Sequence, residues 1–278
     1  MKNTRTRRAP NPYPRPHSFP HRTLEPGDYI GVDEVARGSL AGPLVICACA
    51  IKTGIIEGVR DSKKISRTVI PLLAANLKQA ALFYKIALMS PKYIDDNGID
   101  KAWDVGMSAA IEEIQKECDW PVVIDGIQLP HGGKNLTAFP KADDSVYQVS
   151  AASIIAKAKQ LELMEEADRK YPQYDFRSNA GYGVKVHIEA LKKYGPCPIH
   201  RKCYHGVVTR DTPREELAFS KDRAEGLTAR LVNIDSNPYA SDWEKNFVSD
   251  ARSRLGAGKV LSSRQMFFLN AIARRRHA

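Results

Sequence analysis

From residue 28 onward, short apolar runs alternate with longer stretches of helical periodicity, and this alternation most constrains the fold. The predicted strands cover residues 29–34, 44–52, 82–89 and 121–125, with a candidate fifth at 136–139. The predicted helices cover residues 101–118, 150–170 and 184–194. Clustered strands followed by alternating helices indicate an α/β fold in which helices cover a mixed sheet.

The charge balance points to an anionic partner. The 278 residues are 43% hydrophobic, enough for one sizeable core with material left for extensions. The formal charge of +10 favours a polyanion, of which nucleic acid is the simplest. No apolar stretch approaches the roughly 20 residues that span a bilayer, and no apolar secretion segment follows the basic N-terminus. We therefore expect a soluble cytoplasmic protein with no membrane partner.

The cysteines are few, odd in number and partly set in apolar runs, which is typical of reduced thiols. They are Cys47, Cys49, Cys118, Cys197 and Cys203. Residues 197–205 also bring together four soft or borderline ligands, namely Cys197, His200, Cys203 and His205. A zinc site there stays open. The spacing is not that of a standard zinc knuckle, and packing with hydrogen bonding accounts better for His200.

Two terminal segments differ in composition from the rest. The first 26 residues carry six lysines and arginines against one acidic residue, and six prolines. Such a segment cannot form a helix or a core, so residues 1–27 are predicted to be a disordered basic arm. Binding of phosphates through counterion release and simple solubilisation both stay open as its role. Residues 28–210 are predicted to form the main α/β domain.

Residues 211–278 are predicted to be a helical extension. Capping-box patterns begin at Ser241 and at Ser262, and each precedes an apolar stripe. The stripe of the first helix is Trp243, Phe247, Ala251 and Leu255, and that of the second is Met266, Leu269 and Ile272. A glycine-containing link joins the two, which predicts a helical hairpin. Three roles stay open for it: docking on the domain of residues 28–210, contact with nucleic acid, and binding of a replication or repair protein.

Acidic side chains gather where the predicted strands end. Asp33 and Glu34 end the first strand, and Asp125 ends the fourth. Asp143 and Asp144 lie in the loop before the helix that begins near Ser150. If the two strands are neighbours, their ends lie about 5 Å apart, so the carboxylates can share a cation. Oxygen ligands of this kind suit Mg²⁺ or Mn²⁺, and a pair of such ions supports phosphodiester hydrolysis.

Several motifs together resemble type 2 ribonuclease H, over roughly residues 28–208. Any one of them is a weak signal, but their joint order and spacing are specific. They are Gly31-Val32-Asp33-Glu34, Arg37-Gly38 with Leu40-Ala41-Gly42-Pro43, Asp61-Ser62-Lys63-Lys64-Ile65-Ser66, Ile124-Asp125-Gly126, Lys141-Ala142-Asp143, Ser150-Ala151-Ala152-Ser153 through Lys157, Tyr171-Pro172-Gln173-Tyr174, Gly181-Tyr182 and His200-Arg201.

The resemblance implies a ribonuclease H-like fold, a five-stranded mixed sheet flanked by helices with a helical C-terminal lobe. It implies cleavage of RNA in RNA/DNA hybrids and cleavage 5′ of ribonucleotides embedded in DNA, giving 3′-hydroxyl and 5′-phosphate ends. The implied catalytic and metal-binding residues are Asp33, Glu34, Asp125 and Asp143. Asp143 is preferred to Asp144 because it keeps the family's seven-residue offset to Ser150.

The resemblance also assigns substrate binding. The ribose is read by a turn, here Ala36-Arg37-Gly38, and by Tyr182, because the 2′-hydroxyl distinguishes RNA from DNA. Lys63 and Lys64 are the candidates for gripping phosphates. Alanine replaces the first glycine of the turn, at a cost of roughly 1 kcal/mol if that position needs positive φ.

Two further departures, Gln160-Leu161 and Ala180, remove charge near the expected substrate groove. Whether a single ribonucleotide is cut as well as an RNA tract stays open, as does the choice between Mg²⁺ and Mn²⁺. The alternative function is a non-catalytic nucleic-acid binder, although such a binder gains nothing from acids placed beside phosphate. We expect a monomer.

Overall fold

The computed structural model describes most of the chain from residue 27 onward. The described residues are 27–51, 54–59, 62–204, 206–207, 225–226, 228–229, 231, 233–237, 240–259, 261, 265, 269 and 272, and the side chain of Lys63 lies outside them. The predicted basic arm therefore falls outside the described residues, except for Gly27. The division into arm, catalytic domain and extension stays a prediction.

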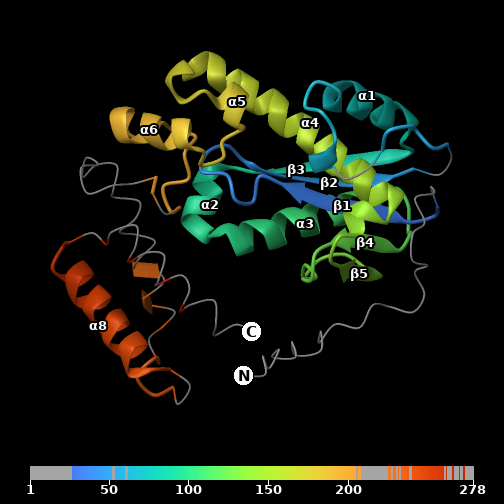
Figure 1. Cartoon of the computed structure of the whole chain (residues 1–278). Coiled ribbons are helices and arrows are strands. Elements are labelled where there is room, and N and C mark those ends of the chain that lie inside the picture. Colours follow the sequence, from blue (N-terminus) through green and yellow to red (C-terminus); the bar gives the residue numbers. More distant parts are fainter. Residues whose placement is uncertain are drawn as a thin grey trace, which may run out of the picture. The chain divides into compact units, whose positions relative to one another are not determined.

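Five strands form one sheet in the order β3-β2-β1-β4-β5 (Figure 1). The strands are β1 Ile30–Val35, β2 Leu44–Ala50, β3 Phe83–Met89, β4 Val122–Asp125 and β5 Leu136–Phe139. β4 pairs in parallel with β1 on one side and with β5 on the other. The predicted five-stranded sheet is confirmed, including its candidate fifth strand.

The chain divides into two compact units. The first comprises residues 27–33, 47–86 and 107–155, and the second comprises residues 34–46, 87–106 and the described residues from 156 onward. Helices α3 (Ile99–Gln115) and α4 (Tyr147–Lys170) contribute residues to both. Each unit is considered by itself.

In the first unit, helices cover both faces of the sheet. Helix α1 (Ile70–Ala80) and the beginning of α4 lie on one face, and the end of α3 lies on the other (Figure 1). The contact between β1 and α4 is close, because a Cβ added at Gly31 would lie 2.1 Å from the carbonyl carbon of Gln148. Val123, Val146 and Val149 are buried together beside it.

Sequence reasoning missed α1. Its N-cap residue, Val69, makes no side-chain capping bond, so the usual start signal is absent. The signal that could have found the helix is its apolar stripe, since Ile70, Leu73 and Leu77 recur at helical spacing and are all buried. The short α2 (Pro91–Asn97) was also missed, although Ser90 caps it by accepting a hydrogen bond from the backbone N–H of Tyr93 at 3.1 Å.

The second unit contains a helical lobe with its own core. The lobe includes the end of α4, the short α5 (Phe176–Asn179) and α6 (Lys185–Tyr194). Its buried apolar cluster is Ala41, Met164, Ala167, Tyr174, Phe176, Ala190, Leu191, Cys197 and Val207. The predicted helical lobe is therefore present.

A short extended segment, residues 40–42, forms backbone hydrogen bonds to two other segments of this lobe. The N–H groups of Leu40 and Ala41 both donate to the Gly181 carbonyl, at 2.8 and 3.2 Å. On the other side, the N–H of Arg201 donates to the Leu40 carbonyl at 2.8 Å. Gly181 has φ +81, and an added Cβ would lie 2.3 Å from the Ala41 oxygen, so only glycine allows this approach.

The C-terminal part of the second unit contains α8 (Asp242–Gly256), and the predicted capping box of Ser241 and Glu244 is present. A separate apolar cluster forms here from Leu231, Ile234, Ala240, Val248, Ala251, Leu255, Leu261, Leu269 and Ile272. The predicted stripe is only partly correct, because Val248 is buried while Trp243 is half-exposed and stacks on Phe247. Residues 265, 269 and 272 are helical, whereas Ser262 and Met266 lie outside the described residues.

Candidate active site

Asp33 and Asp125 lie level with each other on neighbouring strands. The parallel register of β1 and β4 pairs Val32 with Ile124, so the next residue of each strand is one of the two aspartates. Adjacent strands are about 4.8 Å apart, and equivalent positions point to the same face. Both side chains therefore emerge on the face that the beginning of α4 covers, as the sequence predicted for neighbouring strand ends.

Asp143 is held beside Asp125 by the backbone. It belongs to the 3₁₀ turn Ala142–Asp144, and the Asp125 carboxylate accepts a hydrogen bond from the Ala142 N–H at 2.8 Å. The Ser150 hydroxyl donates to the Asp143 carbonyl at 2.5 Å, which gives the seven-residue offset a structural reason. Asp33 and Asp143 are both buried. The first unit thus places three acidic residues near the ends of β1 and β4.

Glu34, the residue after Asp33 in β1, belongs to the second unit and has its own partners there. The indole N–H of Trp103 donates to its carboxylate at 3.1 Å, and the Arg37 guanidinium lies 3.8 Å from that carboxylate. Sequence reasoning gave Trp103 no role, and no local pattern could have done so, because the two partners are 69 positions apart.

The carboxylates of Asp33, Asp125 and Asp143 are ligands of the type that a divalent metal ion needs. Three carboxylates at one strand edge supply only oxygen donors, which are the ligands that Mg²⁺ and Mn²⁺ prefer. Within the described residues, no group of three or more His, Cys, Asp or Glu side chains is gathered as a metal site. The three aspartates fit such an ion in donor type and in strand register.

The turn that follows β1 contains the strain that the sequence analysis anticipated. Ala36 has φ +70, in the left-handed region that an alanine enters only at a cost of about 1 to 2 kcal/mol. Position 36 therefore has the positive φ at which the sequence analysis expected alanine to be strained. Gly38 is exposed, its φ lies outside the left-handed region, and a Cβ added there would contact nothing within 4 Å. The backbone at Gly38 is therefore open to a ligand.

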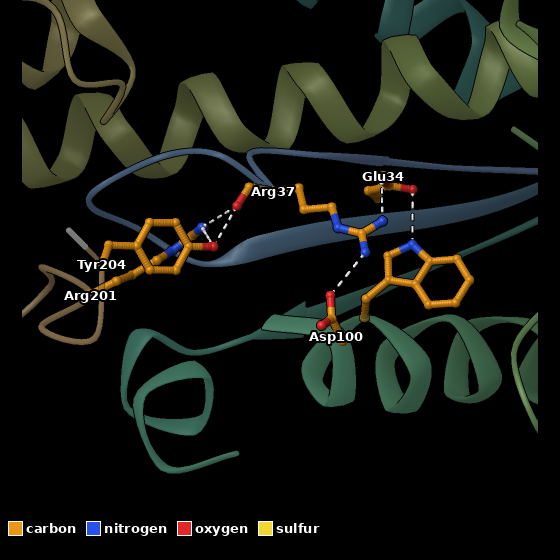
Figure 2. Close-up of polar contacts among 6 residues, drawn as sticks. Glu34, Arg37, Asp100, Arg201 and Tyr204 are labelled. Atoms are coloured by element: carbon orange, nitrogen blue, oxygen red, sulfur yellow. Dashed lines mark hydrogen bonds and ion pairs between the residues drawn. The ribbon is translucent and has the colours of Figure 1, made fainter. Parts of the chain in front are cut away.

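Arg37, between them, is anchored through both its side chain and its backbone. Its guanidinium donates to Asp100 at 3.2 Å and lies 5.4 Å from the centre of the Trp103 ring. Its carbonyl accepts hydrogen bonds from Arg201 at 3.0 Å and from the Tyr204 hydroxyl at 2.5 Å. Figure 2 shows the side chain and the carbonyl directed to opposite sides. Because both ends are held, the turn has a fixed conformation.

The two candidate phosphate-binding lysines lie in the 3₁₀ turn Ser62–Lys64. The Ser62 hydroxyl hydrogen-bonds that of Ser153 at 2.9 Å, which fixes the turn against α4. The Lys64 ammonium is exposed and forms an ion pair with Asp144. The Lys63 side chain lies outside the described residues.

Tyr182 lies beside a lysine of α4. The Lys157 ammonium is 5.5 Å from the centre of the Tyr182 ring and donates to Gln160 at 2.6 Å. Gln160 is buried and donates to the Ala180 carbonyl at 3.0 Å. Gln160, one of the replacements expected to remove charge near the substrate groove, thus links α4 to the segment before Tyr182.

The cysteines and histidines form no reactive centre in the described part of the chain. All five cysteines are free thiols. Burial raises the pKa of Cys49 to about 12 and that of Cys197 to about 11. The His187 and His200 rings are buried and joined by a 2.9 Å hydrogen bond, and His200 also accepts from the Cys197 N–H at 2.8 Å. The packing role expected for His200 is confirmed.

For the zinc alternative, the Cys203 thiol hydrogen-bonds the Ile94 carbonyl at 3.8 Å, and His205 lies outside the described residues. The Cys203 N–H donates to Asp95, a buried carboxylate of α2, at 3.0 Å. These contacts attach the segment to α2, so the described residues give a structural account of Cys203 without a metal.

Nowhere in the described ranges does a helix combine the length and the apolar character that crossing a membrane requires.

Comparisons with known proteins agree on one family. The family described as Ribonuclease HII matches residues 30–207. Ribonuclease HII of Desulforamulus reducens is 41% identical over 196 residues, which cover 70% of this chain and 95% of that protein. Ribonuclease HII of Ruminiclostridium cellulolyticum is 40% identical over 187 residues, 66% of this chain and 73% of that protein.

The fold agrees as well. The crystal structure of ribonuclease H2 from Pyrococcus horikoshii superimposes with a TM-score of 0.53 at 26% identity, covering 64% of this chain and 94% of that one. The chain therefore belongs to the ribonuclease HII family, as an endoribonuclease with a ribonuclease H-like fold.

Proposed function

We propose that this endoribonuclease cleaves RNA in RNA/DNA hybrids and cleaves 5′ of ribonucleotides embedded in duplex DNA, leaving 3′-hydroxyl and 5′-phosphate ends. The observation that carries the proposal is the register of β1 with β4, which sets Asp33 level with Asp125. The Ala142 bond adds Asp143 to that edge. Carboxylates placed together are costly unless a cation accompanies them, and the net charge of +10 favours a polyanionic substrate.

We propose Asp33, Glu34, Asp125 and Asp143 as the residues that hold Mg²⁺ or Mn²⁺. Two such ions, when bound, would lower the pKa of the attacking water and offset the charge that develops on the leaving oxygen. The chain's part is to fix the carboxylates. The Ala142 N–H orients Asp125, and Trp103 orients Glu34.

We extend the proposal to the residues that contact the substrate. The backbone of the turn Ala36–Gly38 and the ring of Tyr182 would read the ribose, where the 2′-hydroxyl marks an RNA residue. Lys63 and Lys64 would bind backbone phosphates. The open surface over Gly38 supports this assignment, since a backbone amide contacts a sugar closely only where no side chain intervenes. A cytoplasmic location, a monomeric state and a replication or repair partner for residues 211–278 stay predictions of the sequence.

The test is a cleavage assay with three duplexes of one sequence: all-DNA, DNA with a single ribonucleotide, and a continuous RNA/DNA hybrid. Each is incubated with Mg²⁺, with Mn²⁺ and with a chelator. The proposal expects metal-dependent cleavage of the two ribose-containing duplexes, with the cut mapped 5′ of the ribonucleotide. Cleavage of the all-DNA duplex, or cleavage that survives chelation, would overturn it.

A further inference from the structure

The Arg37 carbonyl accepts hydrogen bonds from two donors, the buried Arg201 and the half-buried Tyr204, which come from one short segment of the lobe. Arg201 and Tyr204 both donate to it, and Arg201 also donates to the Gly42 carbonyl at 2.9 Å and to the Tyr204 hydroxyl at 3.1 Å (Figure 2). The Arg201 guanidinium lies 5.2 Å from the centre of the Tyr204 ring. Arginine and tyrosine thus form one clamp on the turn.

Arg201 is an unusual residue to find there. Its side chain is completely buried, and its hydrogen bonds run to neutral oxygens. One terminal nitrogen, Nη2, has no hydrogen-bond partner among the described residues. Burying a cation without a carboxylate is unfavourable, so stability alone does not explain an arginine at this position. What the guanidinium achieves is to hold the Arg37 and Gly42 carbonyls, on either side of residues 38–41.

The turn needs to be held. Ala36, directly before Arg37, has φ +70, and a strained residue of this kind persists only where its surroundings fix it. Glycine would adopt the same backbone without strain. The Tyr204 hydroxyl adds a donor to the Arg37 carbonyl that a phenylalanine would lack, while the ring contact with Arg201 would remain.

We propose that Arg201 and Tyr204 are positioning residues that hold the turn Ala36–Gly38 in its ribose-reading conformation, and that the Tyr204 hydroxyl compensates for alanine at position 36. This inference rests on the proposed reading of ribose by that turn. It assigns part of the discrimination between ribose and deoxyribose to two side chains that do not themselves touch the substrate.

The test uses Tyr204→Phe, which removes one hydroxyl and keeps the ring. Two ratios are measured: kcat/KM for the single-ribonucleotide duplex over the continuous hybrid, and, with chelator present, affinity for the single-ribonucleotide duplex over all-DNA. Loss of one hydrogen bond corresponds to roughly a tenfold effect. We expect both ratios to fall by up to about that factor in Tyr204→Phe. We expect Ala36→Gly in the same background to restore most of the loss, because it removes the strain that the hydroxyl offsets.

Tyr174→Phe is the matched control. The Tyr174 hydroxyl also donates to a backbone carbonyl, that of Gly195 at 2.7 Å, and the Tyr174 side chain is buried, whereas that of Tyr204 is half-buried. We expect a similar loss of thermal stability with both ratios unchanged. Arg201→Lys keeps the positive charge but loses the planar guanidinium that donates to both the Gly42 and the Arg37 carbonyls. It is expected to lower the ratios at least as far as Tyr204→Phe does.

Three outcomes would overturn the inference: unchanged ratios in Tyr204→Phe, an equal fall in Tyr174→Phe, or a double variant with Ala36→Gly no better than Tyr204→Phe alone. The proposed function fails separately, if the unaltered protein does not cut the ribose-containing duplexes. In that case the binding ratio still decides whether the clamp sets ribose preference.

Discussion

The Asp125 carboxylate accepts a 2.8 Å hydrogen bond from the backbone N–H of Ala142, 17 residues further along the chain. This bond fastens the 3₁₀ turn of residues 142–144 to the end of β4. Since Asp33 lies level with Asp125 across β1 and β4, one backbone contact is enough to add Asp143 to the same strand edge. The proposed metal ligands are therefore positioned by the sheet and by one adjoining turn.

Gly38→Ala is expected to separate function from folding. The added methyl group would contact no protein atom within 4 Å, and the backbone there is compatible with alanine. Replacing glycine at such a position stabilises a fold by about 0.4 to 1 kcal/mol. If the turn meets the ribose, the methyl group obstructs it, and kcat/KM should fall by at least about tenfold.

The control for Gly38→Ala is Gly256→Ala at the end of α8, where an added Cβ also contacts nothing within 4 Å. Urea unfolding and hybrid cleavage are measured on both variants. Cleavage by Gly38→Ala at the rate of the Gly256 variant would show that the substrate does not approach this turn.

The buried His200 predicts a specific pH dependence of stability. Burial, together with the facing His187 ring, lowers the pKa of His200 to about 3, with a smaller contribution from Lys202. An unfolded histidine has a pKa of about 6.5. Above that pH both states are neutral at this residue. Below it the unfolded chain binds a proton that native His200 does not bind, so stability falls as pH drops from about 6.5 towards 3, by up to about 1.4 kcal/mol per pH unit.

Urea unfolding at several pH values between 7 and 4 measures this slope. His200→Gln should make it shallower, because the unfolded variant has one proton fewer to gain. His131→Gln serves as the comparison, since it removes an exposed imidazole instead of the buried one. An identical slope in His200→Gln and the unaltered protein would assign the pH dependence to other groups.

Lys64→Ala is expected to affect nucleic-acid binding more than stability. The ion pair with Asp144 is exposed, and such pairs contribute at most about 1 kcal/mol. A lysine that contacts one phosphate contributes about one unit to the slope of log affinity against log salt. We expect that slope to fall by about one for the hybrid, with kcat little changed. Lys92→Ala, at another exposed lysine paired with Asp96, should leave the slope as it is. An unchanged slope in Lys64→Ala would remove the residue from the phosphate contacts.

Local patterns predicted the parts of the fold that depend on neighbouring residues. The apolar runs that end at Asp33 and Asp125 are strands, and the capping box at Ser241 begins a helix. Even the strain at Ala36 could be anticipated, because a turn that needs positive φ is a local property. Whether the two acid-bearing strands are neighbours stayed a condition in the sequence analysis, and their parallel pairing meets it.

Contacts between distant residues could not be predicted in this way. The Trp103 bond to Glu34 joins residues 69 positions apart, and the Arg201 bond to the Arg37 carbonyl joins residues 164 apart. Neither has a periodicity or spacing in the sequence, since each depends on how whole elements pack. Residues that hold the proposed site in place are for this reason harder to predict than residues that form it.

The most direct test of the central claim compares Asp143→Asn with Asp144→Asn in the Mg²⁺-dependent cleavage of an RNA/DNA hybrid. The two aspartates are neighbours in one 3₁₀ turn, but Asp143 is buried at the strand edge while Asp144 is exposed and pairs with Lys64. Because a catalytic metal supplies several kcal/mol, Asp143→Asn should lose at least about a hundredfold in rate while still folding and binding the hybrid. Asp144→Asn should stay within a few-fold of the unaltered protein. An Asp143→Asn variant that cleaves at the unaltered rate would contradict the assignment of these carboxylates to catalysis.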